Sequence, residues 1–170
     1  MSTRLKYPQV CSGKDFAALL NEQATVSSGV PDSVVRAVLP ELVHYVPAPG
    51  EEHAVALAFG ARVGGGRPVV LMQNSGLGRC LDALLGLQKL YEIGLVLVVV
   101  NRGELAWEEP QHQEWGKLTQ PLLGLLDVPI LDLGTVGLAG VKECFETAYG
   151  EAKEQLVILL VHRGNIDEAA

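Results

Sequence analysis

The sequence predicts an α/β fold of the doubly wound kind, with a mostly parallel sheet of about six strands and helices on both faces. Short apolar runs without charge occur at 68–72, 94–100 and 156–161. Continuous apolar runs of this length are typical of parallel strands that are covered on both faces. Helical patterns separate these runs along the chain, as crossover connections between parallel strands require.

Length and composition favour one globular domain over 1–170. The chain has 170 residues, of which 48% are hydrophobic and 19% are charged, so it can form a full core. The formal net charge is −7. An acidic surface argues against nucleic acid or an anionic membrane as a partner.

Cysteine usage and the apolar segments indicate a cytoplasmic protein. The three cysteines are far apart and show no CxxC spacing, which predicts free thiols in a reducing compartment. The first ten residues contain no apolar signal core. The longest apolar run, 94–100, is too short to span a bilayer.

The first half of the chain alternates helix and strand candidates. Ser12 can cap a helix over 12–22, because an apolar stripe follows it. We then expect a strand at 24–27, a turn at 28–31, a helix at 34–39 that Pro40 stops, and a strand at 42–46.

The segment 49–62, PGEEHAVALAFGAR, predicts a helix of unusual character. It is apolar on every side after its first turn, and such helices are buried in a core or an interface. Glu51 and Glu52 lie in that first turn. A carboxylate at the mouth of a buried helix is costly unless something uses it.

The second half continues the alternation. We expect strands at 68–72, 94–100, 128–133 and 156–161, and helices around 81–91, at 121–126 and at 138–149. A polar turn, 73–78, follows the first of these strands. Residues 104–120 are expected to be polar and irregular, and 163–170 to form a polar tail.

Four loops leave the carboxyl ends of the predicted strands, at 28–33, 47–51, 73–78 and 101–119. Ligands of doubly wound proteins bind at this edge of the sheet. The chemically interesting side chains of the chain lie in these loops.

Common catalytic and nucleotide-binding motifs are absent from the sequence. Gly76 and Gly78 begin a Rossmann-like pattern, but its third glycine is missing. The chain has no GxxxxGK[ST], GxSxG or HExxH motif, and its four histidines are not at metal-ligand spacing, so no metal site is expected.

Ordinary structural roles explain each candidate residue taken singly. An acid such as Glu51 in a first helical turn stabilises the helix dipole. Asn74 and Ser75 could cap the next helix, and His112 could be a solvated loop residue.

Taken together, the segments resemble the pyrimidine-binding (PYR) domain of thiamine diphosphate-dependent enzymes. The resemblance is closest to sulfopyruvate decarboxylase alpha subunits and phosphonopyruvate decarboxylases. The matching segments, in family order, are GVPDS (29–33), GEEHAVALAFGA (50–61), MQNSGLG (72–78), RG (102–103), EEPQHQEWGKLT (108–119) and LLGLLDVPI (122–130).

The resemblance implies site roles. The family pattern is Glu-x-x-Ala with a glycine nine residues beyond the glutamate, and Ala54 and Gly60 assign that glutamate to Glu51 rather than Glu52. The family glutamate hydrogen-bonds the aminopyrimidine ring and promotes formation of the thiazolium ylid. The remaining implied residues are Asn74, Ser75, Gly76 and Gly78 for the cofactor, His112 for catalysis, and Asp32, Ser33, Arg79, Gln111 and Lys117 for the substrate. Close relatives have Asn where this chain has Arg79.

The resemblance also implies a partner. The family binds Mg²⁺ and diphosphate through a GDG…N motif on a PP domain, and no GDG occurs in this sequence. We therefore expect the alpha subunit of a thiamine diphosphate-dependent 2-oxoacid decarboxylase, active with a beta (PP-domain) subunit in a hetero-oligomer such as α2β2 or larger. Sulfopyruvate is the first substrate expected. The alternatives are phosphonopyruvate decarboxylase, another thiamine diphosphate-dependent synthase or oxidoreductase subunit, and a non-catalytic PYR-fold assembly or regulatory protein.

Overall fold

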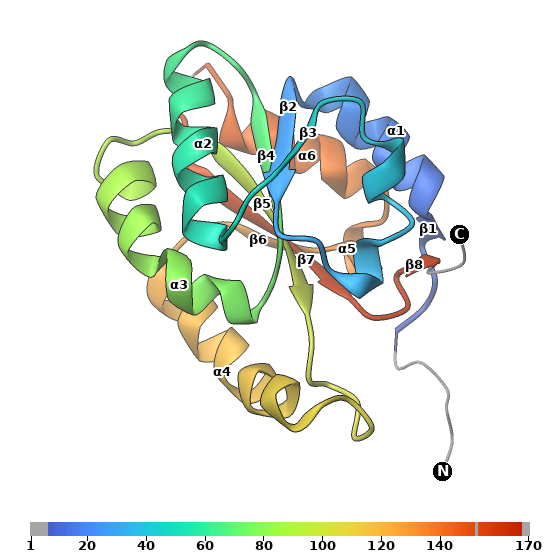
Figure 1. Ribbon diagram of the computed structural model, residues 1–170. Helices are drawn as coiled ribbons and strands as arrows, with labels where there is room; N and C mark the ends of the chain where they lie inside the picture. The colour runs from blue at the N-terminus through green and yellow to red at the C-terminus, as the bar shows by residue number, and fades with distance from the viewer. Residues whose placement is uncertain (1–6, 152, 168–170) are drawn as a thin grey trace.

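The computed structural model describes residues 7–151 and 153–167, and its centre is a six-stranded parallel sheet (Figure 1). The strand order is β3-β2-β4-β5-β7-β6, and every neighbouring pair is parallel. This confirms the predicted fold class. The strands are β2 (Val26–Gly29), β3 (Tyr45–Pro47), β4 (Pro68–Gln73), β5 (Leu95–Asn101), β6 (Ile130–Asp132) and β7 (Leu156–His162).

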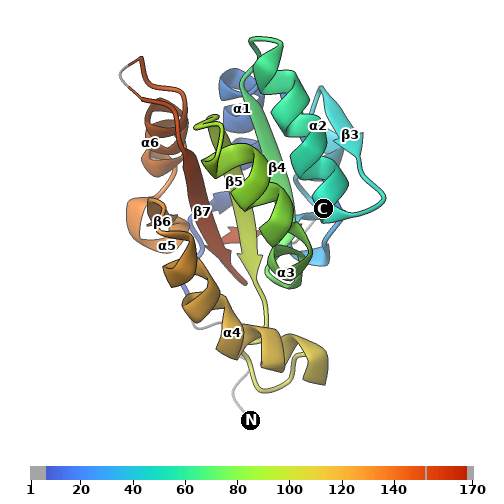
Figure 2. The same ribbon diagram turned by 90° about the vertical axis from the view of Figure 1, so that its left-hand side faces the viewer.

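Two helical layers cover the sheet (Figure 2). Alternate side chains of β5 pack against the two helical layers, because successive side chains of a strand point to opposite faces. Val96 and Val98 pack with α1 (Gly13–Gln23) and α6 (Ala139–Ala148). Leu95, Leu97 and Val99 pack on the other face, which is covered by α2 (Glu51–Val63), α3 (Ser75–Ala83) and α4 (Pro110–Leu126).

Local sequence signals set several helix ends. Ser12 caps α1, because its hydroxyl accepts a hydrogen bond from the backbone N–H of Asp15 at 3.1 Å. Asp32 caps a 3₁₀ turn, η1 (Ser33–Val35), in the same way. A π-helical segment, η3 (Leu84–Lys89), continues α3 where one helix was expected. A short helix, α5 (Leu133–Val136), follows β6.

Two sequence predictions of secondary structure were wrong. The segment 104–120 was expected to be irregular, but α4 begins at Pro110 and runs through Pro121 to Leu126. Proline favours the first turn of a helix, and the polar residues that suggested a loop lie mainly on the outer side of α4. The expected helix at 34–39 is instead split into η1 and a second 3₁₀ turn, η2 (Leu39–Glu41).

Helix α2 is buried on one side only within this chain. Ala54, Val55 and Ala58 are fully buried against the sheet, whereas His53 and Ala56 are exposed. The apolar composition that predicted burial all round therefore leaves an outward face of small and apolar residues in this chain. An interface role for that face stays a prediction.

Two short strands from the first and last parts of the described residues form a small parallel ladder. Strand β1 (Cys11–Ser12) pairs with β8 (Ile166–Asp167), which lies within the predicted polar tail 163–170. Residues 168–170 of that tail lie outside the described residues. No helix in the part that the structure describes is long and apolar enough to cross a bilayer.

The three cysteines are buried free thiols. Burial raises the pKa of Cys11 to about 11, with a contribution from Asp15. Burial likewise raises the pKa of Cys80 and of Cys144 to about 12 each, with smaller contributions from nearby carboxylates. These thiols are protonated at neutral pH, so they are poor nucleophiles.

Candidate functional site

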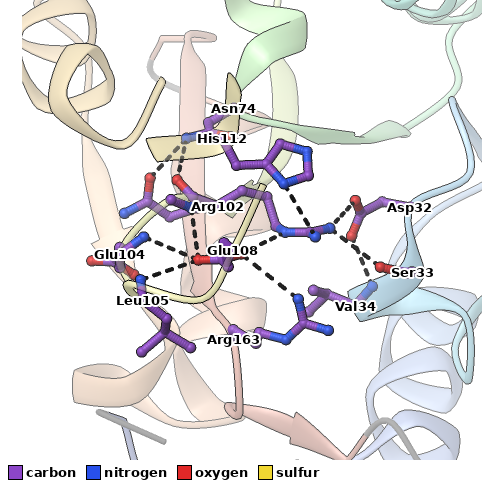
Figure 3. A network of polar contacts seen from close by, with 12 residues as sticks. Asp32, Ser33, Val34, Asn74, Arg102, Glu104, Leu105, Glu108, His112 and Arg163 are labelled. Carbon is purple, nitrogen blue, oxygen red and sulfur yellow. Dashed lines mark hydrogen bonds and ion pairs between the residues drawn. The ribbon is translucent and has the colours of Figure 1, made fainter. Parts of the chain in front are cut away.

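Polar side chains from the predicted loops meet at the carboxyl edge of the sheet (Figure 3). Arg102 is the residue directly after β5, and it is 7% exposed. Its Nη1 donates to Oδ2 of Asp32 at 2.7 Å and to Oγ of Ser33 at 3.2 Å. Its Nε donates to Oε1 of Glu108 at 2.9 Å. One guanidinium thus joins the loop after β2 to the loop after β5.

Glu108 is the second anchor of this network. Its Oε2 accepts hydrogen bonds from the backbone N–H groups of Gly103, Glu104 and Leu105, at 2.8, 3.1 and 3.2 Å. Burial raises the pKa of this carboxyl, but the hydrogen bonds from Arg102 and the backbone outweigh burial and leave the pKa lowered. A second guanidinium, from Arg163, lies 3.7 Å from Oε1. Glu108 is therefore ionised, and it fixes the loop that leads to α4.

His112 lies in the first turn of α4, beside this network. The side chain is buried, and its Nδ1 faces Nη2 of Arg102 at 3.5 Å. Gly103 lets the helix approach this closely. A Cβ at position 103 would lie 1.7 Å from the carbonyl oxygen of His112, and the backbone there has φ +87°.

Substitution of Gly103 tests this close approach. We expect Gly103→Ala to lower the free energy of unfolding by more than Gly65→Ala, because both glycines have φ +87° but a Cβ at Gly65 meets nothing within 4 Å. The left-handed backbone alone costs about 1–2 kcal/mol for a non-glycine residue, and only position 103 adds a clash with the backbone. Urea unfolding of both variants measures the difference, and equal losses would contradict the packing argument.

Glu51 occupies a second corner of the same edge. It is the first residue of α2, and it is only 5% exposed. A Cβ at Gly76 would lie 2.5 Å from Cγ of Glu51, so only glycine fits beside this carboxylate. Nε of Arg79 lies 3.8 Å from Oε2 of Glu51, but the Arg79 side chain is 62% exposed. The carboxylate is thus held in a close-packed setting with one solvent-exposed counter-ion.

Glu52 is placed differently from Glu51. Its side chain is 34% exposed and accepts a hydrogen bond from Nη2 of Arg79 at 3.2 Å. Its own backbone N–H is the largest cause of its lowered pKa, and Arg79 and His53 also lower it. These contacts are those of a surface carboxylate in a first helical turn.

Asn74 joins the start of α3 to the segment around Arg102. It is fully buried at the start of α3. Its amide nitrogen has three acceptors within hydrogen-bond distance for its two hydrogens: Oδ1 of Asn101, the carbonyl of Arg102 and Oγ1 of Thr119, at 3.2, 2.9 and 2.7 Å. Its Oδ1 has no hydrogen-bond partner among the described residues. A buried acceptor without a partner costs free energy.

Comparison with known proteins finds sequence similarity to the alpha subunits of sulfopyruvate decarboxylases. The chain is 29% identical over 119 residues to the sulfopyruvate decarboxylase subunit alpha of Methanococcus maripaludis, which covers 67% of this chain and 71% of that protein. It is 33% identical over 84 residues to the same subunit of Methanocaldococcus jannaschii, over about half of each chain (49% and 50%). The chain is thus similar to sulfopyruvate decarboxylase alpha subunits over about half to two thirds of its length.

Other comparisons agree with this relationship. The phosphonopyruvate decarboxylase of Streptomyces viridochromogenes is 33% identical over 66% of this chain but only 30% of its own length. A thiamin diphosphate-dependent enzyme of Mycobacterium smegmatis has the same fold, with a TM-score of 0.66 and 18% identity over 91% of this chain and 31% of its own. No family model matches the chain.

Among the described residues, several predicted site residues make no hydrogen bond or ion pair with Glu51 or Arg102. Gly78 is exposed and lies beside α4, where a Cβ would meet the ring of Trp115 at 2.6 Å. Ser75 is partly buried and Gln111 is exposed. Lys117 is exposed, pairs with Glu114 at 2.5 Å, and lines an open cavity of about 430 Å³ beside the 103–106 loop.

Sequence reasoning missed the residues at the centre of the network. Arg102 was included only within the matching segment 102–103 and was given no role in the site. Glu108 and Arg163 were given no role either. A charged residue directly after a buried strand, followed by glycine, is a signal that could have identified Arg102. The pairing with Asp32, 70 positions away, comes from the fold alone.

A buried histidine lies further along the same edge, at the end of β7. The ring nitrogens of His162 lie 2.5 Å from Oε2 of Glu104 and 2.8 Å from Oδ2 of Asp132. Tyr7 stacks on the ring with a centroid distance of 3.8 Å. Burial lowers the pKa of His162, but the two carboxylates outweigh burial and raise it above 6.5. The imidazolium therefore ties the 103–109 loop to the end of β6.

The stability of the folded chain should depend on the charge of His162. Because the folded-state pKa is raised, the stabilisation is complete below the unfolded pKa and is lost as the pH rises from about 6.5 through the folded pKa. We expect the free energy of unfolding to fall over that window in the wild type. His162→Gln should remove this part of the pH dependence, and His44→Gln, at an exposed position, should keep it. Urea unfolding across the window measures both, and an unchanged profile for His162→Gln would contradict the assignment.

Proposed function

We propose that this chain is the alpha subunit of a thiamine diphosphate-dependent 2-oxoacid decarboxylase, with sulfopyruvate as its first substrate and phosphonopyruvate as the alternative. The similarity to sulfopyruvate and phosphonopyruvate decarboxylases supports this proposal. The observation that carries it is Glu51, a carboxylate that is 5% exposed at the start of α2 and close-packed against Gly76. A carboxylate that is held in this way can accept a hydrogen bond from a ring that donates one.

Glu51 and Asn74 offer hydrogen-bond acceptors, as an aminopyrimidine ring with its N–H donors requires. Glu51 provides a carboxylate acceptor, and Asn74 provides a buried acceptor oxygen without a partner among the described residues. Gly76 leaves room where any other side chain would collide with Glu51. When bound, thiamine diphosphate supplies the nucleophilic carbon that adds to a keto group. In this proposal Glu51 holds the pyrimidine and exchanges a proton with its ring nitrogen.

The network around Arg102 would form the substrate side of the site. His112 would contact the keto acid, and the loop that Glu108 anchors would position this histidine. Arg79 and Lys117 keep their proposed roles as cations for the second anionic group of the substrate. Both are exposed on the same side of the molecule as α3 and α4, so they could meet an anion that enters from solvent.

A beta (PP-domain) subunit with a GDG…N motif would supply the Mg²⁺ and diphosphate contacts. The word "alpha" in the names of the relatives supports a second subunit. The chain spans 71%, 50% and 54% of the three alpha subunits and 30% of the phosphonopyruvate decarboxylase. The exposed apolar face of α2 is a reasonable contact for the partner in a hetero-oligomer such as α2β2 or larger. We place this complex in the cytoplasm.

The test is reconstitution. The chain is co-expressed with a GDG-bearing partner, and release of carbon dioxide from sulfopyruvate and from phosphonopyruvate is measured with thiamine diphosphate and Mg²⁺. Release of carbon dioxide from sulfopyruvate supports sulfopyruvate as the substrate. Release from phosphonopyruvate alone supports phosphonopyruvate instead. If a folded complex binds the cofactor but releases carbon dioxide from neither substrate, the decarboxylase proposal is wrong. The alternative of another thiamine diphosphate-dependent synthase or oxidoreductase subunit is then favoured. A chain that takes up no cofactor with any partner would support the non-catalytic alternative.

A further inference from the structure

The two ring nitrogens of His112 have different surroundings. Nδ1 faces Nη2 of Arg102 at 3.5 Å, whereas Nε2 makes no hydrogen bond to another residue in 7–151 or 153–167. Figure 3 shows one ring nitrogen turned toward the guanidinium and the other turned away. What His112 offers to a ligand therefore depends on which nitrogen carries the hydrogen.

The guanidinium of Arg102 is fixed and can only donate. Its Nε and Nη1 are hydrogen-bonded to Glu108 and Asp32, so Nη2 is held in its direction toward the ring. A guanidinium carries five N–H donors and no acceptor. The ring nitrogen that faces it must therefore be the acceptor. In the neutral imidazole the hydrogen then lies on Nε2.

We propose that Arg102 is a positioning residue that holds His112 in the tautomer with hydrogen on Nε2. The outward nitrogen of His112 is then a hydrogen-bond donor, and it fits an oxygen atom of the ligand, such as a keto or carboxylate oxygen. This role in the reaction rests on the proposed function, because a 2-oxoacid carries both kinds of oxygen. The tautomer itself does not depend on it.

Arg102 does not act as the receptor for the substrate anion. Asp32 and Glu108 lie within 2.7 and 2.9 Å of its nitrogens, so its charge is already offset within the network. All three guanidinium nitrogens face protein acceptors. The residue that meets the ligand is therefore His112, and Arg102 acts through it.

The test is a long-range ¹H–¹⁵N correlation spectrum of the chain labelled with ¹⁵N-histidine. It is recorded over a series of increasing pH values, and the tautomer is read where the signals of His112 no longer change with pH. His112→Gln assigns the signals of His112. We expect His112 to show the pure Nε2–H pattern, whereas the exposed His44 shows an exchanging average of both tautomers. A wild-type His112 with hydrogen on Nδ1, or with the same average as His44, would overturn the proposal.

A matched pair of variants isolates the contribution of Arg102. Arg102→Lys keeps the charge but loses the planar fork, so the His112 signals should move toward the average of His44. Arg163→Lys changes the other guanidinium near Glu108, which does not contact the ring, and should leave the His112 signals in place. Equal spectra for the two variants would contradict the role of Arg102. These spectra need no partner, cofactor or turnover, so this result is independent of whether the reconstituted complex decarboxylates.

The donor role is tested separately in the reconstituted complex. The amide nitrogen of glutamine can replace Nε2 of histidine, whereas asparagine is too short. We expect His112→Gln to keep kcat/KM about tenfold above that of His112→Asn, a difference of one hydrogen bond. An equal loss in both variants, in a complex whose wild type is active, would overturn the donor role.

Discussion

Glu51→Gln should lower the turnover of the reconstituted complex by about 100-fold or more, the usual contribution of a positioned proton-transfer group. Glutamine keeps the size of the side chain and fills the same space beside Gly76. It cannot carry the charge or the exchangeable proton of the carboxyl group. The measurement is steady-state release of carbon dioxide, together with thiamine diphosphate binding, which separates a loss of chemistry from a loss of cofactor.

Glu52→Gln is the matched control for this prediction. Glu52 is the next residue of the same helix, but its side chain is 34% exposed and pairs with Arg79. We expect its turnover to stay within about twofold of the wild type, since exposed ion pairs contribute little. An equal loss from both substitutions would mean that the glutamate has been assigned to the wrong position.

Arg102→Met should lower the free energy of unfolding of the chain by about 3–5 kcal/mol, because it leaves two buried carboxylates without their shared cation. The side chains of Asp32 and Glu108 are 6% and 1% exposed, so water cannot replace the lost partner. The measurement is urea unfolding at neutral pH.

Lys117→Met is the control for this loss. Lys117 and Glu114 also form an ion pair, but both side chains are about two-thirds exposed (68% and 70%). We expect a change of less than about 1 kcal/mol there. If Arg102→Met were no more destabilising than Lys117→Met, the buried network would not be a structural anchor of the site.

Much of the fold could be predicted because strands and helices carry local patterns. The apolar runs that became β4, β5 and β7 have no charges, and this alone indicates strands in the middle of a parallel sheet. The expected irregular segment failed because polarity alone does not distinguish a loop from a helix with a solvated face. Pro110, at the first position of α4, was the helix signal within that segment.

The candidate site could be predicted only in part. The four loops were identified from the strand ends. Asp32, Asn74 and His112 lie together at that edge (Figure 3), and Glu51 is the first residue of α2, the helix that follows β3. The choice of Glu51 over Glu52 came from the resemblance. Its physical counterpart is the burial of the first and the exposure of the second, which depends on the packing of α2 against α3.

By itself, the sequence determined the fold class, the edge of the sheet where the site lies, and the kind of protein to which the chain is related. Each of these follows from patterns within short segments, such as apolar runs, turn residues and motif spacing. Only the tertiary structure decided that Arg102, and not Arg79 or Lys117, is the buried cation of the site. The reason is that burial and pairing depend on segments far apart in the chain, here the loops after β2 and β5, which parallel strands bring together at one edge.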